Sequence, residues 1–212
     1  MDEYQTPEEL EEGQSLRVRF RRKRRKPRWL IALLVFVLPI LVGAAVILLA
    51  GPPIAFEVVR RLAARRFPDV HWIDPKGLVA WQADTKRVQP VLLDARTVDE
   101  YAVSHLPGAL RMDPYRPLLR PLRSMPKDTA IVVYSTVGYR GARLVHWLTA
   151  QGYNNATALS GSIFAWANEG RPLEREGRPV TEVHPYDDSW KYLLSSDYRI
   201  DVPAVEKKSA AP

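Results

Sequence analysis

A six-residue loop carries the side chains best placed for chemistry in this chain of 212 residues. It runs from Ser135 to Arg140 and separates the apolar run 130–134 from a predicted helix over residues 141–151. Successive backbone N–H groups in such a loop converge above the helix N-terminus, where the helix dipole favours negative charge. Gly138 permits tight curvature, and Arg140 can point inward. The sequence therefore predicts an anion-binding loop made of Ser135, Thr136, Val137, Gly138, Tyr139 and Arg140.

Ser135 is the hydroxyl nucleophile that this loop offers, but a serine needs a base within reach and an oxyanion hole. His146 lies inside the following helix and should point away from the loop, while His105 lies in a separate turn. We therefore expect no hydrolase or phosphatase activity. A structural role is the alternative to anion binding: Ser135 would hydrogen-bond its neighbours, and Arg140 would tie the loop to the body of the protein. Both interpretations are open at this point.

The chain contains no cysteine. This excludes a disulfide framework, a cysteine-based zinc site, a persulfide carrier and a thiolate nucleophile. The four histidines show neither HxxxH nor HExxH spacing, which are the usual patterns of metal ligands on a helix. We therefore expect no metal ion and no cofactor.

Strands and helices alternate along the part of the chain that must position this loop. Predicted strands cover residues 70–73, 90–94, 109–112, 130–134 and 157–159, and predicted helices cover 74–83, 98–104, 141–151 and 163–168. Asp74 and Thr97 are the expected helix caps. Short apolar runs without alternation indicate strands buried on both faces. The pattern predicts an α/β fold with a small parallel sheet and helices on both faces.

Two segments of this pattern resemble the rhodanese family. VLLDARTVDEYAVSHLPGAL is similar to its first half, with an L-D-x-R strand end, an E-Y/F helix and an H-x-P-G-A turn. VVYSTVGYRGARLVHWLTAQGYNNATALSGSIFAWANEGRPL is similar to its second half, with a C-x-x-G-x-R loop, an L-x-G-G strand end and a G-x-P. The resemblance covers residues 70–173. It implies that Asp94, Arg96 and His105 support the loop, the first two as a buried ion pair and His105 through packing.

In the rhodanese family, the first loop residue is a cysteine that carries sulfane sulfur as a persulfide. Ser135 occupies that position here, and a hydroxyl neither ionises near neutral pH nor bonds reversibly to sulfur. We therefore expect a pseudoenzyme that senses an anion or binds a partner. The alternative is a sulfurtransferase-related enzyme with a non-standard loop, rescued by another residue or by the persulfide of a partner.

An apolar segment precedes the domain. Residues 29–50 contain no charged side chain, and a helix of this length spans about 33 Å, enough for a bilayer core of about 30 Å. Nine basic residues lie between Arg17 and Arg28, against four between Arg60 and Arg66. The positive-inside rule then predicts a signal anchor, a single-pass protein with its N-terminus in the cytoplasm and its domain on the extracytoplasmic side.

The charge pattern and the remaining segments complete the predicted organisation. The net charge is +7, and its concentration next to the apolar run indicates lipid headgroups near Arg17–Arg28 rather than nucleic acid. The apolar segment 184–200 should dock on the domain or on a protein partner, with Trp190, Tyr192, Leu193 and Leu194 as the docking residues. The predicted parts are a tail (1–28) with a disordered start, the membrane helix (29–50), a juxtamembrane linker and helix (51–69), the rhodanese-like domain (70–173) and a C-terminal extension (174–212) with a disordered end.

Overall fold

The computed structural model of this protein describes residues 37–200. The predictions for the tail (1–28), for the first part of the apolar segment (29–36) and for the end of the extension (201–212) lie outside the described residues. The chain divides into two compact units, residues 1–43 and 44–212, and the site and the sheet belong to the second.

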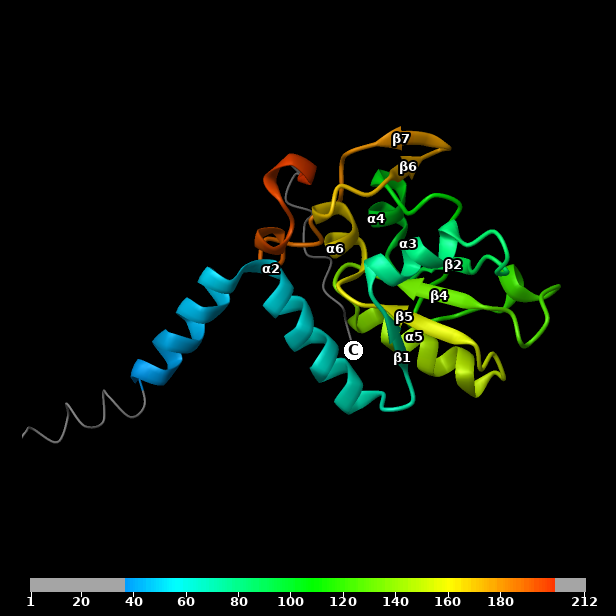
Figure 1. Cartoon of the computed structure of the whole chain (residues 1–212), viewed down its shortest axis with the longest axis horizontal. Coiled ribbons are helices and arrows are strands. Elements are labelled where there is room, and N and C mark those ends of the chain that lie inside the picture. The colour runs from blue at the N-terminus through cyan, green and yellow to red at the C-terminus, as the bar shows by residue number, and fades with distance from the viewer. Residues whose placement is uncertain (1–36, 201–212) are drawn as a thin grey trace, which may run out of the picture. The chain divides into compact units, whose positions relative to one another are not determined.

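A five-stranded parallel sheet forms the centre of the second unit (Figure 1). The strands follow the spatial order β1-β5-β4-β2-β3, and every pair of neighbours is parallel. Their bounds are β1 His71–Ile73, β2 Val91–Asp94, β3 Leu110–Arg111, β4 Ile131–Tyr134 and β5 Ala156–Leu159. The predicted α/β class with a small parallel sheet is therefore confirmed. Each predicted strand is present with bounds that differ by one residue at one or both ends, and β5 is one residue longer than predicted.

Helices cover both faces of the sheet, as the sequence predicted. α3 (Pro75–Ala83) and α6 (Ser162–Asn168) share a buried cluster with Val132 on one face. α5 (Tyr139–Ala150) and the second half of α2 share a cluster with Val133 on the other. Consecutive residues of a strand point to opposite faces, so the continuous apolar run of β4 supplies both clusters.

Local capping residues set where two helices begin. The Asp74 carboxylate accepts the N–H of Gly77 at 2.7 Å at the start of α3. Thr97 and Glu100 form a capping box at the start of α4 (Val98–Val103), in which each side chain accepts the backbone N–H of the other residue. Both predicted caps are confirmed, because capping depends on side chains three residues apart and on nothing distant in the chain.

Helix α2 runs from Leu38 to Arg66 and is kinked at Gly51, where the backbone is non-helical (φ 69°, ψ −172°). Gly51 lacks the Cβ that would oppose this conformation, and the prolines that follow it can open a new helical turn. The predicted membrane helix overlaps α2 from Leu38 onward. Within residues 37–200, no helix combines the length and the apolar character needed to cross a membrane.

The C-terminal part of the chain contains a β-hairpin that the sequence did not predict. No strand was predicted after residue 159, but β6 (Leu173–Arg175) and β7 (Arg178–Val180) form an antiparallel hairpin. Glu176 and Gly177 both have positive φ, as a two-residue type I′ turn requires. Short 3-10 helices complete the fold at Arg120–Leu122 (η3), Lys191–Leu193 (η4) and Ser196–Tyr198 (η5).

The segment after the hairpin packs on the domain. Val183 and Leu194 are buried in the same cluster as α3 and α6, and Trp190 and Leu193 lie against that cluster. Tyr192 was predicted to dock as well, but its side chain is 69% exposed. Leu193, the next residue of η4, packs against the cluster instead, so these two adjacent side chains point in different directions.

Candidate functional site

The predicted loop connects the C-terminal end of β4 to the N-terminus of α5. Helix α5 begins at Tyr139, two residues before the predicted start. Gly138 has a φ of 120°, and a Cβ built there would lie 3.4 Å from the Trp72 ring. The loop therefore favours glycine at this position for its backbone conformation, whereas the contact with Trp72 alone would tolerate a Cβ. Ser135, Thr136 and Val137 are buried.

Ser135 is held by its neighbours and has no base. Its Oγ accepts the N–H of Gly138 at 3.1 Å, and its own N–H donates to Ser162 Oγ at 3.0 Å. The two candidate bases lie elsewhere: His146 Nδ1 is 2.8 Å from Asp69, and His105 Nδ1 is 3.1 Å from the Tyr101 carbonyl oxygen. The geometry therefore offers no activated serine nucleophile.

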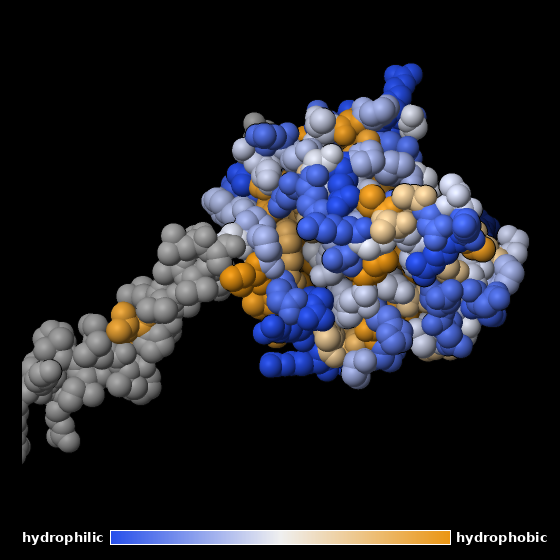
Figure 2. Space-filling view, in the orientation of Figure 1, coloured by the Kyte–Doolittle hydropathy of each residue, from blue (hydrophilic) through white to orange (hydrophobic). Residues whose placement is uncertain are grey.

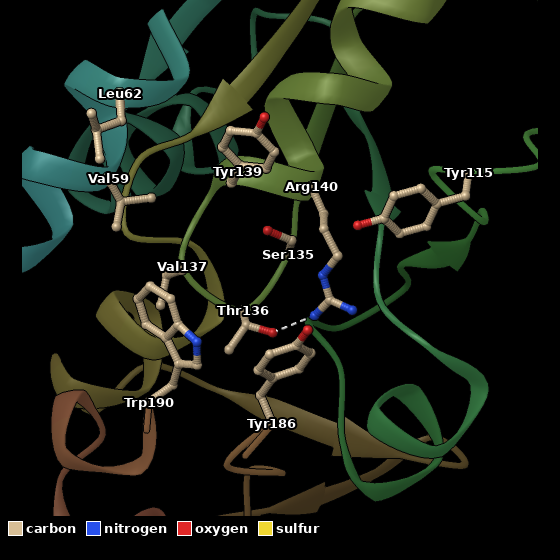
Figure 3. Close-up of a pocket in the computed structure, with 10 residues that line it drawn as sticks. All are labelled: Val59, Leu62, Tyr115, Ser135, Thr136, Val137, Tyr139, Arg140, Tyr186 and Trp190. Carbon is tan, nitrogen blue, oxygen red and sulfur yellow. Dashed lines mark hydrogen bonds between the residues drawn. The ribbon is translucent and has the colours of Figure 1, made fainter. Parts of the chain in front are cut away.

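Arg140 forms a two-pronged ion pair with Glu100 of α4. Its Nη1 and Nη2 donate to the two Glu100 carboxylate oxygens at 2.8 and 2.6 Å. Thr136 Oγ1 bonds to both partners. It accepts from Arg140 at 2.5 Å (Figure 3) and donates to Glu100 at 2.7 Å. The guanidinium thus fastens the loop to α4, and the charge of Glu100 cancels its charge at the site.

Glu100 is the functional residue that the sequence interpretation missed. Its capping-box position beside Thr97 was readable from the T-x-x-E spacing, but its contact with Arg140 joins residues 40 positions apart. Burial raises the pKa of Glu100, and the hydrogen bonds and charge of Arg140 outweigh this effect, so its pKa falls to about 2. The carboxylate is therefore ionised, and the pair is charged, over the whole physiological range.

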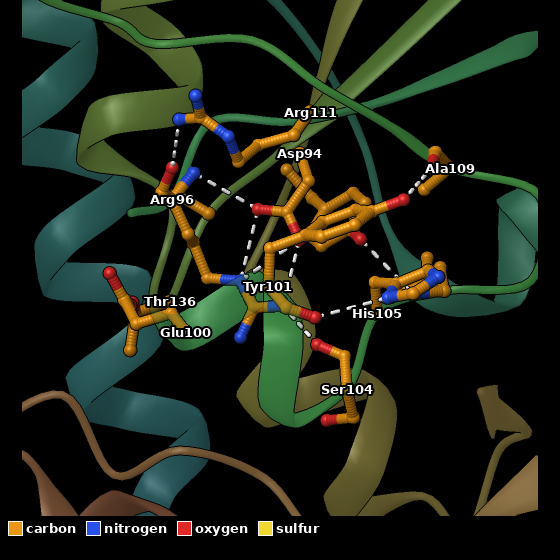
Figure 4. Close-up of polar contacts among 12 residues, drawn as sticks. Asp94, Arg96, Glu100, Tyr101, Ser104, His105, Ala109, Arg111 and Thr136 are labelled. Atoms are coloured by element: carbon orange, nitrogen blue, oxygen red, sulfur yellow. Dashed lines mark hydrogen bonds and ion pairs between the residues drawn. The ribbon is translucent and has the colours of Figure 1, made fainter. Parts of the chain in front are cut away.

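Asp94 and Arg96 form a second, fully buried ion pair at the end of β2 (Figure 4). Arg96 Nη2 donates to Asp94 Oδ2 at 2.7 Å and also to the carbonyl oxygen of Ser104 at 2.5 Å. Burial alone would lower the pKa of Arg96, but the adjacent Asp94 carboxylate outweighs it and raises that pKa. Because Ser104 ends α4, this ion pair fixes the helix that carries Glu100. The ion pair therefore supports the loop indirectly, through α4 and Glu100.

His105 lies against α4 and the hairpin. Its ring stacks on Tyr101 with the ring centroids 3.9 Å apart, and its Nε2 is 3.5 Å from Glu174 Oε1. The backbone of His105 also exchanges two hydrogen bonds of 2.9 Å with that of Glu174. Asp94 and Arg96 therefore support the loop from the side of α4. The contacts of His105 instead connect β6 to the turn that contains His105 itself.

A cavity of about 290 Å³ opens above the loop (Figure 3). Four segments far apart in the sequence form it: α2, the connection between β3 and η3, the Ser135–Arg140 loop and the C-terminal segment. Its walls are aromatic and aliphatic, and its floor is the loop. The lining residues are Val59, Leu62, Tyr115, Ser135, Thr136, Val137, Tyr139, Arg140, Tyr186 and Trp190. The Tyr186 ring lies 4.8 Å from the Arg140 guanidinium carbon, so the C-terminal segment covers the remaining face of that cation.

The floor of the cavity keeps backbone donors without partners. Among residues 37–200, no protein acceptor receives the N–H groups of Thr136, Val137 or Tyr139. These groups lie in the loop and at the first turn of α5, where the helix dipole adds to their partial positive charge. The site therefore offers hydrogen-bond donors to an acceptor oxygen without offering a free cation. In the described part of the chain, no three His, Asp or Glu side chains gather as metal ligands do.

The chain thus combines a small parallel sheet with a buried loop over the N-terminus of a helix, an arrangement whose helix dipole favours negative charge. Comparison with known families places the chain more narrowly. Residues 74–169 match the family model described as a rhodanese-like domain. The chain belongs to the rhodanese-like family.

Two proteins of known name and one solved structure are similar to the chain, and the first of these relatives supports the family assignment. The chain is 37% identical over 106 residues to a protein of Allochromatium vinosum named sulfurtransferase, covering 49% of this chain and 94% of that protein. It is 32% identical over 122 residues to the tRNA uridine(34) hydroxylase of Staphylococcus haemolyticus, covering 55% of this chain and 35% of that protein. The crystal structure of a rhodanese-like domain protein from Staphylococcus aureus matches with a TM-score of 0.43 and 26% identity, covering 50% of this chain and 99% of that one.

The Arg140–Glu100 pair yields a prediction about stability. Glu100→Gln removes the negative charge and leaves a buried guanidinium without its counterion. The difference between the ordinary pKa of 4.5 and about 2 corresponds to about 3 kcal/mol, at about 1.36 kcal/mol per pKa unit. We expect the variant to lose about 3 kcal/mol of unfolding free energy at pH 7, measured by urea unfolding of the purified full-length chain.

The pH dependence of this loss has a definite sign. Folding lowers the pKa of Glu100, so its contribution is complete above about pH 4.5 and disappears as the pH falls toward 2. The wild type and Glu100→Gln should therefore converge in stability across that window. Glu169→Gln is the matched control, because Glu169 pairs with Arg171 at the surface and should change stability by less than about 1 kcal/mol. An equal loss in both variants would contradict the role given to the buried pair.

Proposed function

We propose that this protein is a membrane-anchored rhodanese-like domain that does not transfer sulfur and instead acts as a binding module, with the cavity above the loop as its ligand site. The observation that carries this proposal is Ser135 at the first position of the loop in a chain without cysteine. Its hydroxyl accepts a hydrogen bond from Gly138 and has no base beside it. A buried serine in this setting supports the loop and forms no persulfide.

The cavity favours a particular ligand chemistry. Its walls are tyrosine, tryptophan, valine and leucine side chains, which favour an apolar body. Its floor presents the free N–H groups of Thr136, Val137 and Tyr139, which favour an acceptor oxygen. Because Glu100 neutralises Arg140, a compact and highly charged anion gains little there. We therefore propose that the ligand is a carboxylate or similar oxygen acceptor on an apolar body, offered by a small molecule or by a partner protein.

The sulfur chemistry is tested by restoring the nucleophile. A thiolate placed at residue 135 would lie at the N-terminus of α5 beside free N–H groups, and such a position lowers a thiol pKa. We expect the Ser135→Cys full-length chain to show cyanide–thiosulfate turnover above background and the wild type to show none. Ser189→Cys is the matched control, because it adds a single thiol at an exposed position outside the loop.

The alternative, a sulfurtransferase-related enzyme with a non-standard loop, is favoured by the name of the Allochromatium vinosum relative. The same assay separates the two proposals. Wild-type turnover that disappears in Ser135→Ala would refute the binding module and support the enzyme. An inert Ser135→Cys chain would contradict the retained cradle and leave the loop with a structural role alone.

Ligand chemistry is tested with two probes and a matched pair of variants. We expect 3-phenylpropionate, a carboxylate on an aromatic body, to bind more tightly than thiosulfate in calorimetric titrations of the full-length chain. Tyr186→Ala removes an aromatic wall of the cavity and should weaken 3-phenylpropionate about fivefold, the effect of an aromatic contact of about 1 kcal/mol. Tyr192→Ala removes an equally large but exposed ring and should leave binding unchanged. Tighter binding of thiosulfate would overturn this assignment.

The anchor is proposed from the sequence. The uncharged segment 29–50 supports it, and residues 29–36 of that segment lie outside the described part of the chain. Headgroup contacts of Arg17–Arg28 and a cytoplasmic N-terminus belong to the same proposal. A protein partner, if it approaches through residues 184–200, would meet Tyr186 and Trp190 at the cavity wall.

Orientation is tested by fusing alkaline phosphatase, which is active only after export, behind residue 70. The basic residues flank residues 29–50 nine to four in favour of a cytoplasmic N-terminus, so the fusion should be active in a bacterial host. A cytoplasmic reporter at the same position, such as green fluorescent protein, should be dark. The reverse pattern would place the domain in the cytoplasm and overturn the proposed orientation.

A further inference from the structure

The second half of α2 presents a row of apolar and basic side chains to the solvent. Residues 54, 58, 61, 62, 65 and 66 follow each other at helical spacing and therefore share one side of the helix. We refer to this side as the outer face of α2; it consists of Ile54, Val58, Arg61, Leu62, Arg65 and Arg66, and all six are exposed. In Figure 2 this helix shows orange side chains beside blue ones at the surface.

The opposite side of the same helix is fixed in the core. Phe56 belongs to the buried cluster of α3 and α6, and Ala63 and Phe67 belong to that of α5. With these three side chains buried, α2 cannot rotate to hide its outer face. The exposure of that face is therefore a constant feature of the folded domain.

The charge of this region is basic. Between residues 54 and 66 there are four arginines and one acidic residue, Glu57, so the net charge is 4 − 1 = +3. Glu57 binds Arg60 and Arg61 with oxygen–nitrogen distances of 2.7 Å. Arg65 and Arg66 therefore provide two of the three excess positive charges, next to the apolar side chains of Val58 and Leu62, and the cluster of Glu57, Arg60 and Arg61 provides the third.

We propose that the outer face of α2 docks on the surface of a bilayer that contains anionic lipids. A helix with apolar side chains and arginines on one face is suited to the boundary between headgroups and acyl chains. Chain continuity selects the bilayer, because the uncharged segment that we propose as the anchor ends at Ala50, directly before the kink at Gly51. The inference rests on that anchoring but not on the ligand chemistry of the cavity.

Docking would give the ligand site a defined position. Leu62 belongs both to the outer face of α2 and to the lining of the cavity, and Val59 lines the same wall (Figure 3). A bilayer in contact with this face therefore lies beside one wall of the cavity. An apolar ligand would then enter from the headgroup region rather than from bulk water.

Because the chain has no cysteine of its own, a thiol-reactive label attaches only to a cysteine that is introduced by mutation. Val58→Cys, labelled with a polarity-sensitive fluorophore, reports from the outer face of α2 without lining the cavity. Val88→Cys is the matched control, since Val88 is 81% exposed and lies on the loop between α3 and β2. The full-length chain is placed in nanodiscs of phosphatidylcholine alone or with phosphatidylglycerol. We expect a blue shift for the label at residue 58 in anionic discs, little shift in neutral discs, and none at residue 88.

Charge variants measure how much electrostatic attraction contributes to the docking of α2 on the bilayer. Removing two arginines with Arg65→Gln and Arg66→Gln should weaken docking on the order of 20-fold, at about 1 kcal/mol for each basic residue near an anionic surface. Arg175→Gln with Arg178→Gln makes the same charge change on the β6–β7 hairpin and should have no effect.

Two results would overturn the inference, and alkaline extraction tells them apart. If the chain resists extraction but the label at residue 58 reports water in both lipids, docking is refuted and the anchor stands. If alkali releases the chain from the membrane, the anchor fails and docking fails with it.

Discussion

The ion pair between Arg140 and Glu100 is the constraint on which the site depends. It crosses from the loop to α4, and Thr136 bonds to both partners. Two charges buried this deeply stabilise a structure only when each is fully compensated, and removing one of a pair typically costs about 3–5 kcal/mol. The capping box with Thr97 and the bond from Arg96 to the end of α4 fix Glu100 in place. The position of the loop is thus set by a chain of polar contacts that begins at the end of β2.

This constraint also decides what the loop can bind. An arginine already saturated by a carboxylate and covered by Tyr186 contributes little net charge to a ligand. The remaining attraction comes from unpaired backbone N–H groups, which are partial charges of modest strength. Such donors suit one acceptor oxygen better than a compact dianion. The serine at residue 135 and the neutralised guanidinium are therefore both consistent with the proposed binding module.

The sequence was most informative where structure depends on neighbours in the chain. Asp74 and Thr97 could be recognised as caps because capping joins residues three positions apart, and the apolar run of β4 identified a central strand. Glu100 could be placed on its helix but not in the site, since its partner lies 40 residues away. The hairpin at residues 173–180 was missed because its strands are charged and only three residues long, so the Glu176–Gly177 turn was the one available signal.

The cavity could not be predicted from the sequence for a related reason. Its walls come from α2, from the connection between β3 and η3, from the loop and from the C-terminal segment, and no local pattern links them. Its composition has a physical consequence for the proposed anchor. A wall that includes Leu62 of α2 cannot move independently of the helix that follows the apolar segment, because Phe56 and Phe67 lock this part of α2 into the core. Any force that orients α2 at a bilayer surface must therefore orient the cavity as well. If the outer face of α2 docks as we propose, access to the cavity and contact with the bilayer depend on the same part of α2, the part that follows the kink at Gly51.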